Sequence, residues 1–394
     1  MWIFWGLLIV LTAGFAKLSV IILNRMLALP QPKAVMASIE LIQLLLMPVY
    51  IGLVFRELGG HRIEEQLAGS SWDSVTPLEI VVVTIGMIGF GLLVRSSLAY
   101  LRYRPPACQI SCETTVIDFR QMNGGQPWHE TLVGPRPMRR IALLPGNEQF
   151  SLEVSTQTYV LPRLPKEWDG LSIVHLTDTH FCGAVTRQYF EAVCERAAAL
   201  KPDLFIFTGD LLDDQLLLEW LPETLGRLKA PLGQYFILGN HDWYLDSEAI
   251  RREFERLGWT DMSSRSQAVT STKASSPIIL AGDETPWMGT HPILPSEPNS
   301  AFRILLSHTP DNIEWARRQR IDLVLAGHTH GGQIRLPIIG PVYAPSRHGC
   351  RFASGVFWLN PTLLCVSRGI SGREPIRYQC RPELTKLILK SATD

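Results

Sequence analysis

The sequence predicts an α/β sandwich preceded by an α-helical membrane region. Two features of the 394-residue chain support this prediction. Three long apolar stretches lie in its first quarter, and after Leu171 short apolar runs alternate with amphipathic helical stretches. We therefore predict a membrane region at 1–104, a connector at 105–150 and a folded domain at 151–394.

The three apolar stretches are long enough to cross a bilayer. Met1–Leu23 and Ala34–Phe55 each carry a single charge, and Ile80–Val94 is uncharged and can extend to Leu101 if Arg95 snorkels. About 20 apolar residues span the hydrocarbon core as a helix, so we predict three transmembrane helices. The first stretch lacks a basic start and is followed by further apolar segments, so it is not expected to be cleaved as a signal peptide.

Basic residues in the short loops predict the orientation of the chain in the membrane. With three spans, the first loop and the domain lie on the same side. Five basic residues fall on that side and two on the other, which favours a cell (inner) membrane location with a cytoplasmic domain. The five are Arg25, Lys33, Arg95, Arg102 and Arg104, and the two are Arg56 and Arg62.

Composition gives no indication of a nucleic-acid or obligate protein partner. Lys plus Arg equals Asp plus Glu, at 37 each, and no basic stripe carries interleaved aromatic residues. The seven cysteines lack the repeated spacing of a zinc site or a disulfide scaffold, and the pair Cys108 and Cys112 fits neither. We interpret them as buried or free thiols.

Six apolar runs after Leu171 are typical of strands buried on both faces. Two amphipathic stretches, Thr186–Leu200 and Ser247–Leu257, predict helices between them. In sheets of this kind the ligand site lies beyond the carboxyl ends of the strands. The runs are LSIVHLT, DLFIFTG, QYFILG, PIILAG, RILLSH and DLVLAG.

Polar clusters follow these runs, and they hold five of the ten histidines. Carboxylate, amide oxygen and imidazole together suit manganese, iron, zinc or nickel, whereas calcium sites omit imidazole and structural zinc sites use thiolates. The candidate ligands are Asp178, His180, Asp210, Asn240, His308, His328 and His330.

Seven donors are too many for one ion of four to six ligands, so we predict two divalent metal ions. A carboxylate can bridge two metals, and Asp210 is the candidate. Two metals about 3.5 to 4 Å apart bind phosphoryl oxygens and generate a bridging hydroxide for in-line attack. The expected reaction is hydrolysis of a phosphoester bond.

The ordered series D-x-H, G-D-x-x-D, G-N-H-D, H and G-H-x-H resembles the calcineurin-like metallophosphoesterases from about Leu152 to Lys390. The membrane-associated bacterial branch is the most similar, through LPRLPKEWDGL at Leu161–Leu171, GHTHGGQIRLP at Gly327–Pro337 and the motifs after Ser367. The resemblance implies a metallophosphoesterase-type αββα sandwich. One departure follows the first motif. Members of the family often have glycine two residues after the histidine, whereas here Phe181 and Cys182 separate His180 from Gly183.

The resemblance also implies a role for each site residue. Asp178, His180 and His330 would hold the first metal, Asn240, His308 and His328 the second, and Asp210 would bridge them. His241, paired with Asp242, would protonate the leaving group, and Asp213 would brace a loop. Manganese is the expected metal, with iron, zinc and nickel as alternatives.

The substrate is less narrowly defined by the sequence. A phosphodiester or phosphomonoester is expected, and the apolar segments make a lipid or nucleotide-linked lipid attractive, as in the related UDP-diacylglucosamine hydrolases. Arg187 and Arg368, and also Arg373, are candidates to bind its phosphate. The alternative is an inactive membrane scaffold, but the chain has lost none of the ligands that such a scaffold would be expected to lose.

Overall fold

The computed structural model describes residues 2–59, 75–121, 127–295 and 301–392, and Arg62, used above for orientation, lies outside them. The chain forms two compact units. One comprises Met1–Tyr103 with Leu336–Arg351, and the other comprises Arg104–Arg335 with Phe352–Asp394.

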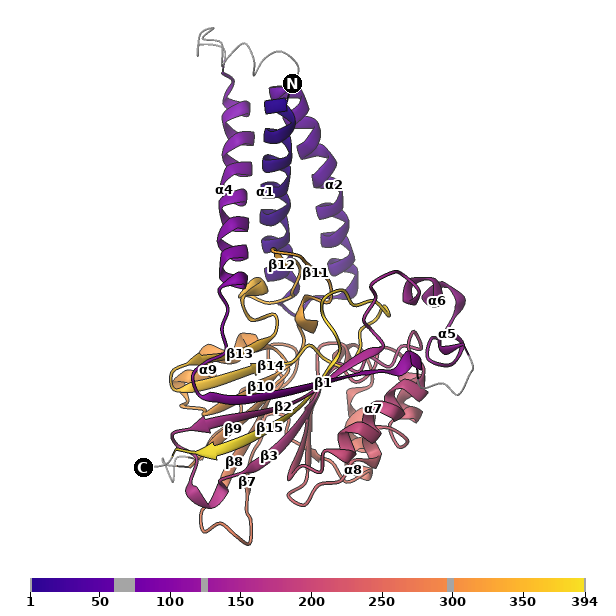
Figure 1. Cartoon of the computed structure of the whole chain (residues 1–394), viewed down its shortest axis with the longest axis vertical. Coiled ribbons are helices and arrows are strands. Elements are labelled where there is room, and N and C mark those ends of the chain that lie inside the picture. The colour runs from indigo at the N-terminus through magenta and orange to yellow at the C-terminus, as the bar shows by residue number, and fades with distance from the viewer. Residues whose placement is uncertain (1, 60–74, 122–126, 296–300, 393–394) are drawn as a thin grey trace. The chain divides into compact units, whose positions relative to one another are not determined.

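The first unit contains α1 (Trp2–Leu27), α2 (Lys33–Leu58) and α4 (Pro77–Leu101), all long and apolar enough to span a membrane (Figure 1). The three predicted helices are therefore confirmed, and the chain is a membrane protein. Glycines allow α1 and α4 to touch, because a Cβ on Gly14 would lie 1.8 Å from the carbonyl oxygen of Gly86. Tyr50 of α2 donates a hydrogen bond of 2.8 Å to the carbonyl of Val82 in α4.

The segment 336–351 packs on the helices of the first unit, although it is remote from them in sequence. The side-chain oxygen of Asn24, in the last turn of α1, accepts a 3.1 Å hydrogen bond from the backbone N–H of Ala344. Gly340 lies so close to α4 that a Cβ there would be 2.6 Å from the ring of Tyr100. The segment therefore lies at the end of the bundle where α1 and α4 end.

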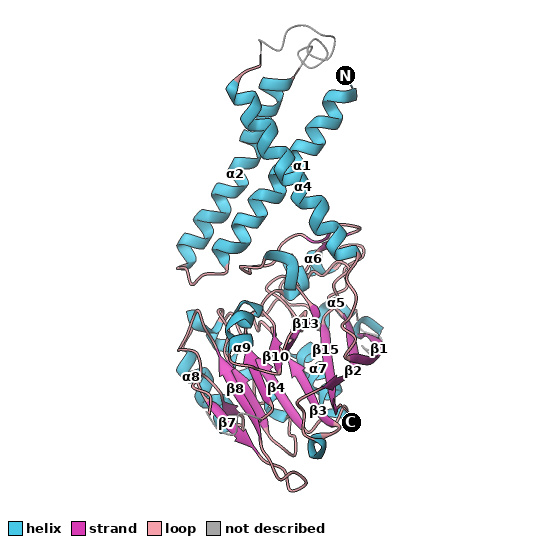
Figure 2. Cartoon of the chain, turned by 90° about the vertical axis from the view of Figure 1, so that its left-hand side faces the viewer, coloured by secondary structure: helices cyan, strands magenta, loops and turns pink. Residues whose placement is uncertain are grey.

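Two sheets form the framework of the second unit (Figure 2). The first has the order β1 (Gln109–Asp118), β2 (Ser151–Leu161), β15 (Glu383–Ser391), β3 (Leu171–Leu176), β4 (Leu204–Thr208), β5 (Gln234–Ile237) and β6 (Thr260–Asp261). The second has the order β13 (Gly355–Leu359), β14 (Thr362–Val366), β10 (Leu323–Ala326), β9 (Arg303–Ser307), β8 (Ile278–Asp283) and β7 (Ser266–Val269). Strands β3 to β6 are parallel, and so are β8, β9, β10 and β14.

Alternate residues of each central strand enter different hydrophobic layers, as the period of a strand requires. In β4, Ile206 lies in the core between the sheets, whereas Phe205 and Phe207 pack under α7 (Arg187–Ala199) and α8 (Ser247–Arg256). On the second sheet, the outer layer lies under α9 (Ile313–Arg318). The order of layers is helix, sheet, sheet, helix, and the predicted αββα sandwich is confirmed.

The remaining elements are short. They are α5 (Trp128–Thr131), α6 (Arg136–Ala142), β11 (Arg335–Leu336), β12 (Gly340–Pro341) and the 3₁₀ turns η2 (Phe119–Gln121), η3 (Lys166–Trp168), η4 (Gln215–Trp220), η5 (Leu225–Arg227), η6 (Asp242–Tyr244), η7 (Pro310–Asn312), η8 (His330–Gly332) and η9 (Gly349–Phe352). The region predicted as a connector supplies α5, α6 and the edge strand β1, which pairs antiparallel with β2. It is part of the second unit.

Candidate metal centre

All seven predicted ligands follow the carboxyl ends of parallel strands. Parallel strands end at a common edge, so residues far apart in sequence meet there. Asp178 and His180 follow β3, Asp210 follows β4, Asn240 follows β5, His308 follows β9, and His328 and His330 follow β10.

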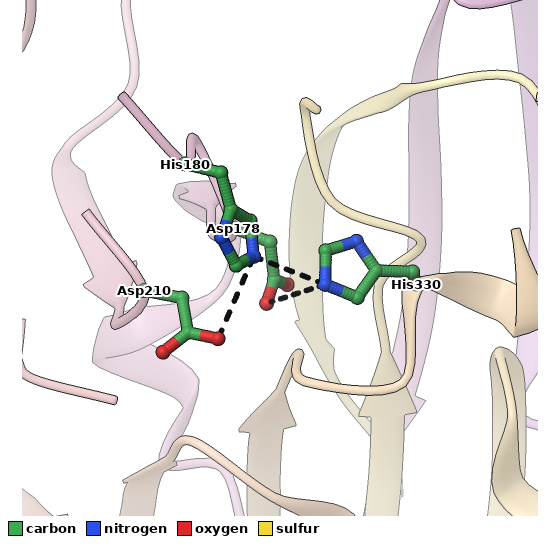
Figure 3. Close-up of side chains that lie close together, drawn as sticks. All are labelled: Asp178, His180, Asp210 and His330. Atoms are coloured by element: carbon green, nitrogen blue, oxygen red, sulfur yellow. Dashed lines mark hydrogen bonds and ion pairs between the residues drawn. The ribbon is translucent and has the colours of Figure 1, made fainter. Parts of the chain in front are cut away.

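One group of donors consists of Asp178, His180, Asp210 and His330, whose ligand atoms lie within 4.8 Å of one another. Figure 3 shows these four side chains pointing toward a common centre. The Nε2 atoms of His180 and His330 are 3.1 Å apart, and Nε2 of His330 is 3.7 Å from Oδ1 of Asp178. These are the residues assigned above to the first metal, together with the bridging carboxylate.

A second group adjoins the first and shares Asp210 with it. Asp210, His308 and His328 can offer atoms within 4.8 Å, and Oδ1 of Asn240 is 3.0 Å from Nε2 of His308. One oxygen of Asp210, Oδ2, is 3.3 Å from Nε2 of His308 and 3.5 Å from Nε2 of His180. This oxygen therefore lies between the two groups, and Asp210 is the residue that would be shared if each group held an ion.

The histidines are oriented by bonds to their other ring nitrogen. Nδ1 of His308 is 2.7 Å from the carbonyl of Thr208, and Nδ1 of His330 is 3.0 Å from the carbonyl of Ser371. A carbonyl can only accept, so Nδ1–H donates in both and Nε2 faces the centre. Metal-binding histidines are commonly held in this way.

Buried carboxylates give the centre a strong negative field. Burial opposes protonation of His180, but Asp213, Asp210 and Asp178 outweigh it and raise the pKa of His180 to about 9. Burial likewise opposes protonation of His308, and Asp210 and Asp178 raise its pKa to about 9. The field that favours protons on these rings also favours a divalent cation.

The donor set fits such a cation. Asp178, Asp210 and His308 are almost fully buried, and burying charge without a counter-ion is costly. The Nε2 atoms of His180 and His330 face each other at 3.1 Å beside two carboxylates. Their lone pairs have a partner only if a proton or a metal ion lies nearby. Oxygen and imidazole donors in this mixture suit a borderline divalent ion.

The backbone is held in an uncommon conformation at five of the seven predicted ligands. Positive φ angles of 47° to 68° occur at these residues, although none of them is glycine. Such residues are rare, and they cluster where function requires them. The five are Asp178, His180, Asp210, His328 and His330.

Glycines in the motifs leave room for the ligands. A Cβ on Gly239 would lie 2.2 Å from Oδ1 of Asp210, and a Cβ on Gly327 would lie 2.4 Å from Oδ2 of Asp178. Both distances are shorter than any normal contact, so a larger residue would displace a ligand.

His241 pairs with a different carboxylate from the one expected. Its Nδ1 is 2.5 Å from Oδ1 of Asp213, and the other oxygen of Asp213 is 2.9 Å from Nδ1 of His180. Asp242 instead accepts the backbone N–H groups of Leu211 and Gly239. The expected pairing of His241 with Asp242 is therefore corrected: neighbours in sequence need not face each other, and the signal for Asp213 was the last position of G-D-x-x-D.

Burial raises the pKa of Asp242 to about 7, with a contribution from Asp210. Its hydrogen bonds join the loops after β4 and β5, which carry Asp210 and Asn240. Asp242 thus braces the ligand loops, the task that the sequence suggested for Asp213.

The three candidate arginines differ in their surroundings. Arg187 forms an ion pair of 2.9 Å with Glu191, and Arg368 binds Glu153 and Glu383 at 2.6 and 3.2 Å. Arg373 is 66% exposed, and its Nε lies 3.9 Å from Asp213. Of the three, Arg373 is thus the one that the described contacts connect to the site.

Sequence reasoning missed Trp287, which packs against both histidines of the second group. Its ring centroid is 4.8 Å from that of His328 and 5.7 Å from that of His308. No motif surrounds Trp287, and only the fold brings the loop after β8 to the ligands.

Comparisons with known proteins agree with this geometry. The calcineurin-like phosphoesterase family profile matches residues 171–332. The chain is 30% identical to an uncharacterized metallophosphoesterase, YkuE of Bacillus subtilis (strain 168), over 62% of the chain and 87% of that protein. It is 28% identical to phosphodiesterase YaeI of Escherichia coli (strain K12), over 55% and 81%. It is 26% identical to UDP-2,3-diacylglucosamine pyrophosphatase LpxG of Chlamydia trachomatis, over 59% and 88%. The chain therefore belongs to the calcineurin-like phosphoesterase family, whose members are hydrolases.

Proposed function

We propose that the chain hydrolyses a phosphoester or phosphoanhydride bond with two divalent metal ions. The observation that carries this proposal is the position of Asp210, whose Oδ2 lies within 3.5 Å of a histidine from each donor group. Asp178, His180 and His330 would hold one ion, and Asn240, His308 and His328 the other. We expect both ions to be manganese.

When bound, two such ions supply Lewis acidity for the phosphoryl oxygens and a nucleophile at neutral pH. The protein's own groups would then serve the leaving group. The side chain of His241 is 24% exposed at the rim of the site, and Asp213 orients its ring. We propose that Nε2 of His241 donates a proton to the departing oxygen, which is an alkoxide in an ester and a phosphate oxygen in an anhydride, and that Arg373 binds the substrate phosphate.

We further propose that the substrate is a phosphorylated or nucleotide-linked membrane lipid. Three membrane-spanning helices keep the enzyme beside such molecules. The name of the chlamydial relative specifies a pyrophosphate bond in a nucleotide-linked lipid.

We also propose that the catalytic domain is cytoplasmic. The end of the bundle at which α1 ends and α2 begins carries Arg25 and Lys33, and Arg102 lies at the end of α4. Basic residues near helix ends favour the cytoplasmic side. Labelling of an introduced surface cysteine from outside intact cells would contradict this orientation.

The alternative of an inactive scaffold has no support in the geometry, because all seven donors converge. A panel of a chromogenic monoester, a chromogenic diester and lipid-linked pyrophosphates would test the function. We expect Asp210→Asn to abolish turnover, whereas Asp214→Asn, a matched change of an exposed residue nearby, keeps it. Equal activity of wild type and Asp210→Asn would overturn the proposal.

A further inference from the structure

The bundle end that contacts the segment 336–351 is strongly basic. Six exposed Lys and Arg side chains of the first unit belong to the segments that meet there. The sequence has no Asp or Glu in residues 24–33, 95–104 or 336–351. The six are Arg25, Lys33, Arg95, Arg102, Arg347 and Arg351.

Large apolar side chains accompany this charge. Ile338 is 68% exposed and Leu336 is 41% exposed, and both lie in the segment 336–351. Asn24 holds the segment to α1, and Gly340 packs against Tyr100 of α4. The exposed residues are therefore fixed to the membrane-spanning bundle, and exposed apolar side chains in such a place are typical of a binding surface.

A groove on α4 extends the basic surface along the helix. It has a volume of about 410 Å³, and its lining combines two arginines with small and apolar residues. Arg95 and Arg102 are seven positions apart, which is close to two helical turns, so both face the same side. The lining residues are Gly91, Val94, Arg95, Leu98, Ala99 and Arg102.

We propose that this end of the bundle is a binding surface for anionic phospholipids. The phosphate of a headgroup binds to Arg95 and Arg102, acyl chains lie along the apolar part of the groove, and Ile338 and Leu336 insert at the interface. Guanidinium groups bind phosphate in two-point geometry, and basic residues beside a membrane helix attract anionic lipids. His330 and Leu336 are only six positions apart in sequence, so the surface is joined to a candidate metal ligand by a short stretch of chain.

Native mass spectrometry of the full chain released from nanodiscs of phosphatidylcholine and phosphatidylglycerol tests the preference. We expect wild type to retain phosphatidylglycerol, and Arg95→Gln/Arg102→Gln to lose it, on the order of fivefold for each arginine. Arg56→Gln is the matched control, since Arg56 is 72% exposed at the opposite end of α2. Equal retention of both lipids by wild type would overturn the proposal. So would a loss of phosphatidylglycerol from Arg56→Gln as large as the loss from the double variant.

A second measurement does not depend on the arginines. An environment-sensitive label on Ile338→Cys, in a Cys112→Ser background, should be quenched by nitroxide lipids in the nanodisc. A label on Lys273→Cys, an exposed position between β7 and β8, should be quenched by aqueous iodide instead. If the label at 338 behaves like the one at 273, the segment does not contact lipid and the proposal fails.

Discussion

At the residue scale, one carboxylate serves two histidines. Asp213 holds the ring of His180, which belongs to the first donor group, and the ring of His241. His180, Asp213 and His241 also form a third group, whose ligand atoms lie within 4.8 Å of one another. Under the proposed function, a metal-binding role for His180 and a proton-donating role for His241 would lie within 4.6 Å, the distance between the two ring centroids. The two roles can be distinguished by experiment.

We predict that His241→Ala retains two metal ions per chain but lowers turnover by roughly 10²- to 10⁴-fold, the usual range for general acid catalysis. The loss should be larger for alkyl esters than for nitrophenyl esters, because nitrophenolate departs without a proton. His308→Ala should behave differently, since high metal concentration should restore part of its activity. Metal analysis and steady-state kinetics provide the measurements, and loss of a metal from His241→Ala would refute the assignment.

The raised pKa values of His180 and His308 predict how the metal-free protein responds to pH. Both move from an ordinary value of 6.5 to about 9, so the folded state binds these protons more tightly than the unfolded state. Their contribution to stability is complete below about pH 6.5 and is lost as pH rises toward 9.

Thermal unfolding in excess chelator should therefore show a melting temperature that falls between pH 6.5 and 9. Protein loaded with metal should lack this fall, because its histidines bind the ion as neutral rings. A chelated protein whose stability rises over this interval would show that the carboxylates do not act on these histidines as described.

At the scale of the elements, the loops that carry the ligands depend on close approach. A Cβ on Gly239 would lie 2.6 Å from Cε1 of His308 as well as against Asp210. We predict that Gly239→Ala lowers metal content and activity together. Gly52→Ala is a suitable control, because a Cβ there would meet no atom within 4 Å. Full metal content in Gly239→Ala would indicate that the loop can move aside.

The central strands could be predicted from sequence, and several peripheral elements could not. The runs that became β3, β4, β5, β8, β9 and β10 are continuous apolar segments because both faces are buried. In contrast, β15 enters the first sheet between β2 and β3, and only long-range pairing places it there. The segment 336–351 joins the helical unit through contacts of Asn24 and Tyr100, which no local pattern encodes.

The convergence of the seven candidate ligands was predictable because each follows a strand of recognisable pattern. The partner of His241 could not be predicted in this way. The adjacent Asp242 turns toward backbone N–H groups, and the more distant Asp213 faces the ring of His241. Trp287 was missed for the same reason: its neighbours His308 and His328 are brought to it only by the sheet.

At the scale of the whole molecule, truncation can remove the three helices and leave the second unit joined to the segment 336–351. We predict that residues 104–394 alone hydrolyse a soluble chromogenic ester, because every candidate ligand lies in the second unit. Without the helices, the segment 336–351 loses its partners and should be cut by trypsin at Arg347 and Arg351. The full chain in nanodiscs is the control and should resist cleavage there. A truncated domain that folds and binds metal but is inert would show that the helices contribute to the reaction.

The dependence of hydrolysis on two metal ions tests the central claim most directly. The full chain should be stripped with chelator, dialysed and titrated with manganese while phosphoester hydrolysis and bound metal are measured together. We predict that activity is lost on stripping and returns as occupancy approaches two ions per chain, with Asp210→Asn failing to recover. Hydrolysis that persists at full rate in protein shown to contain no metal would contradict the account.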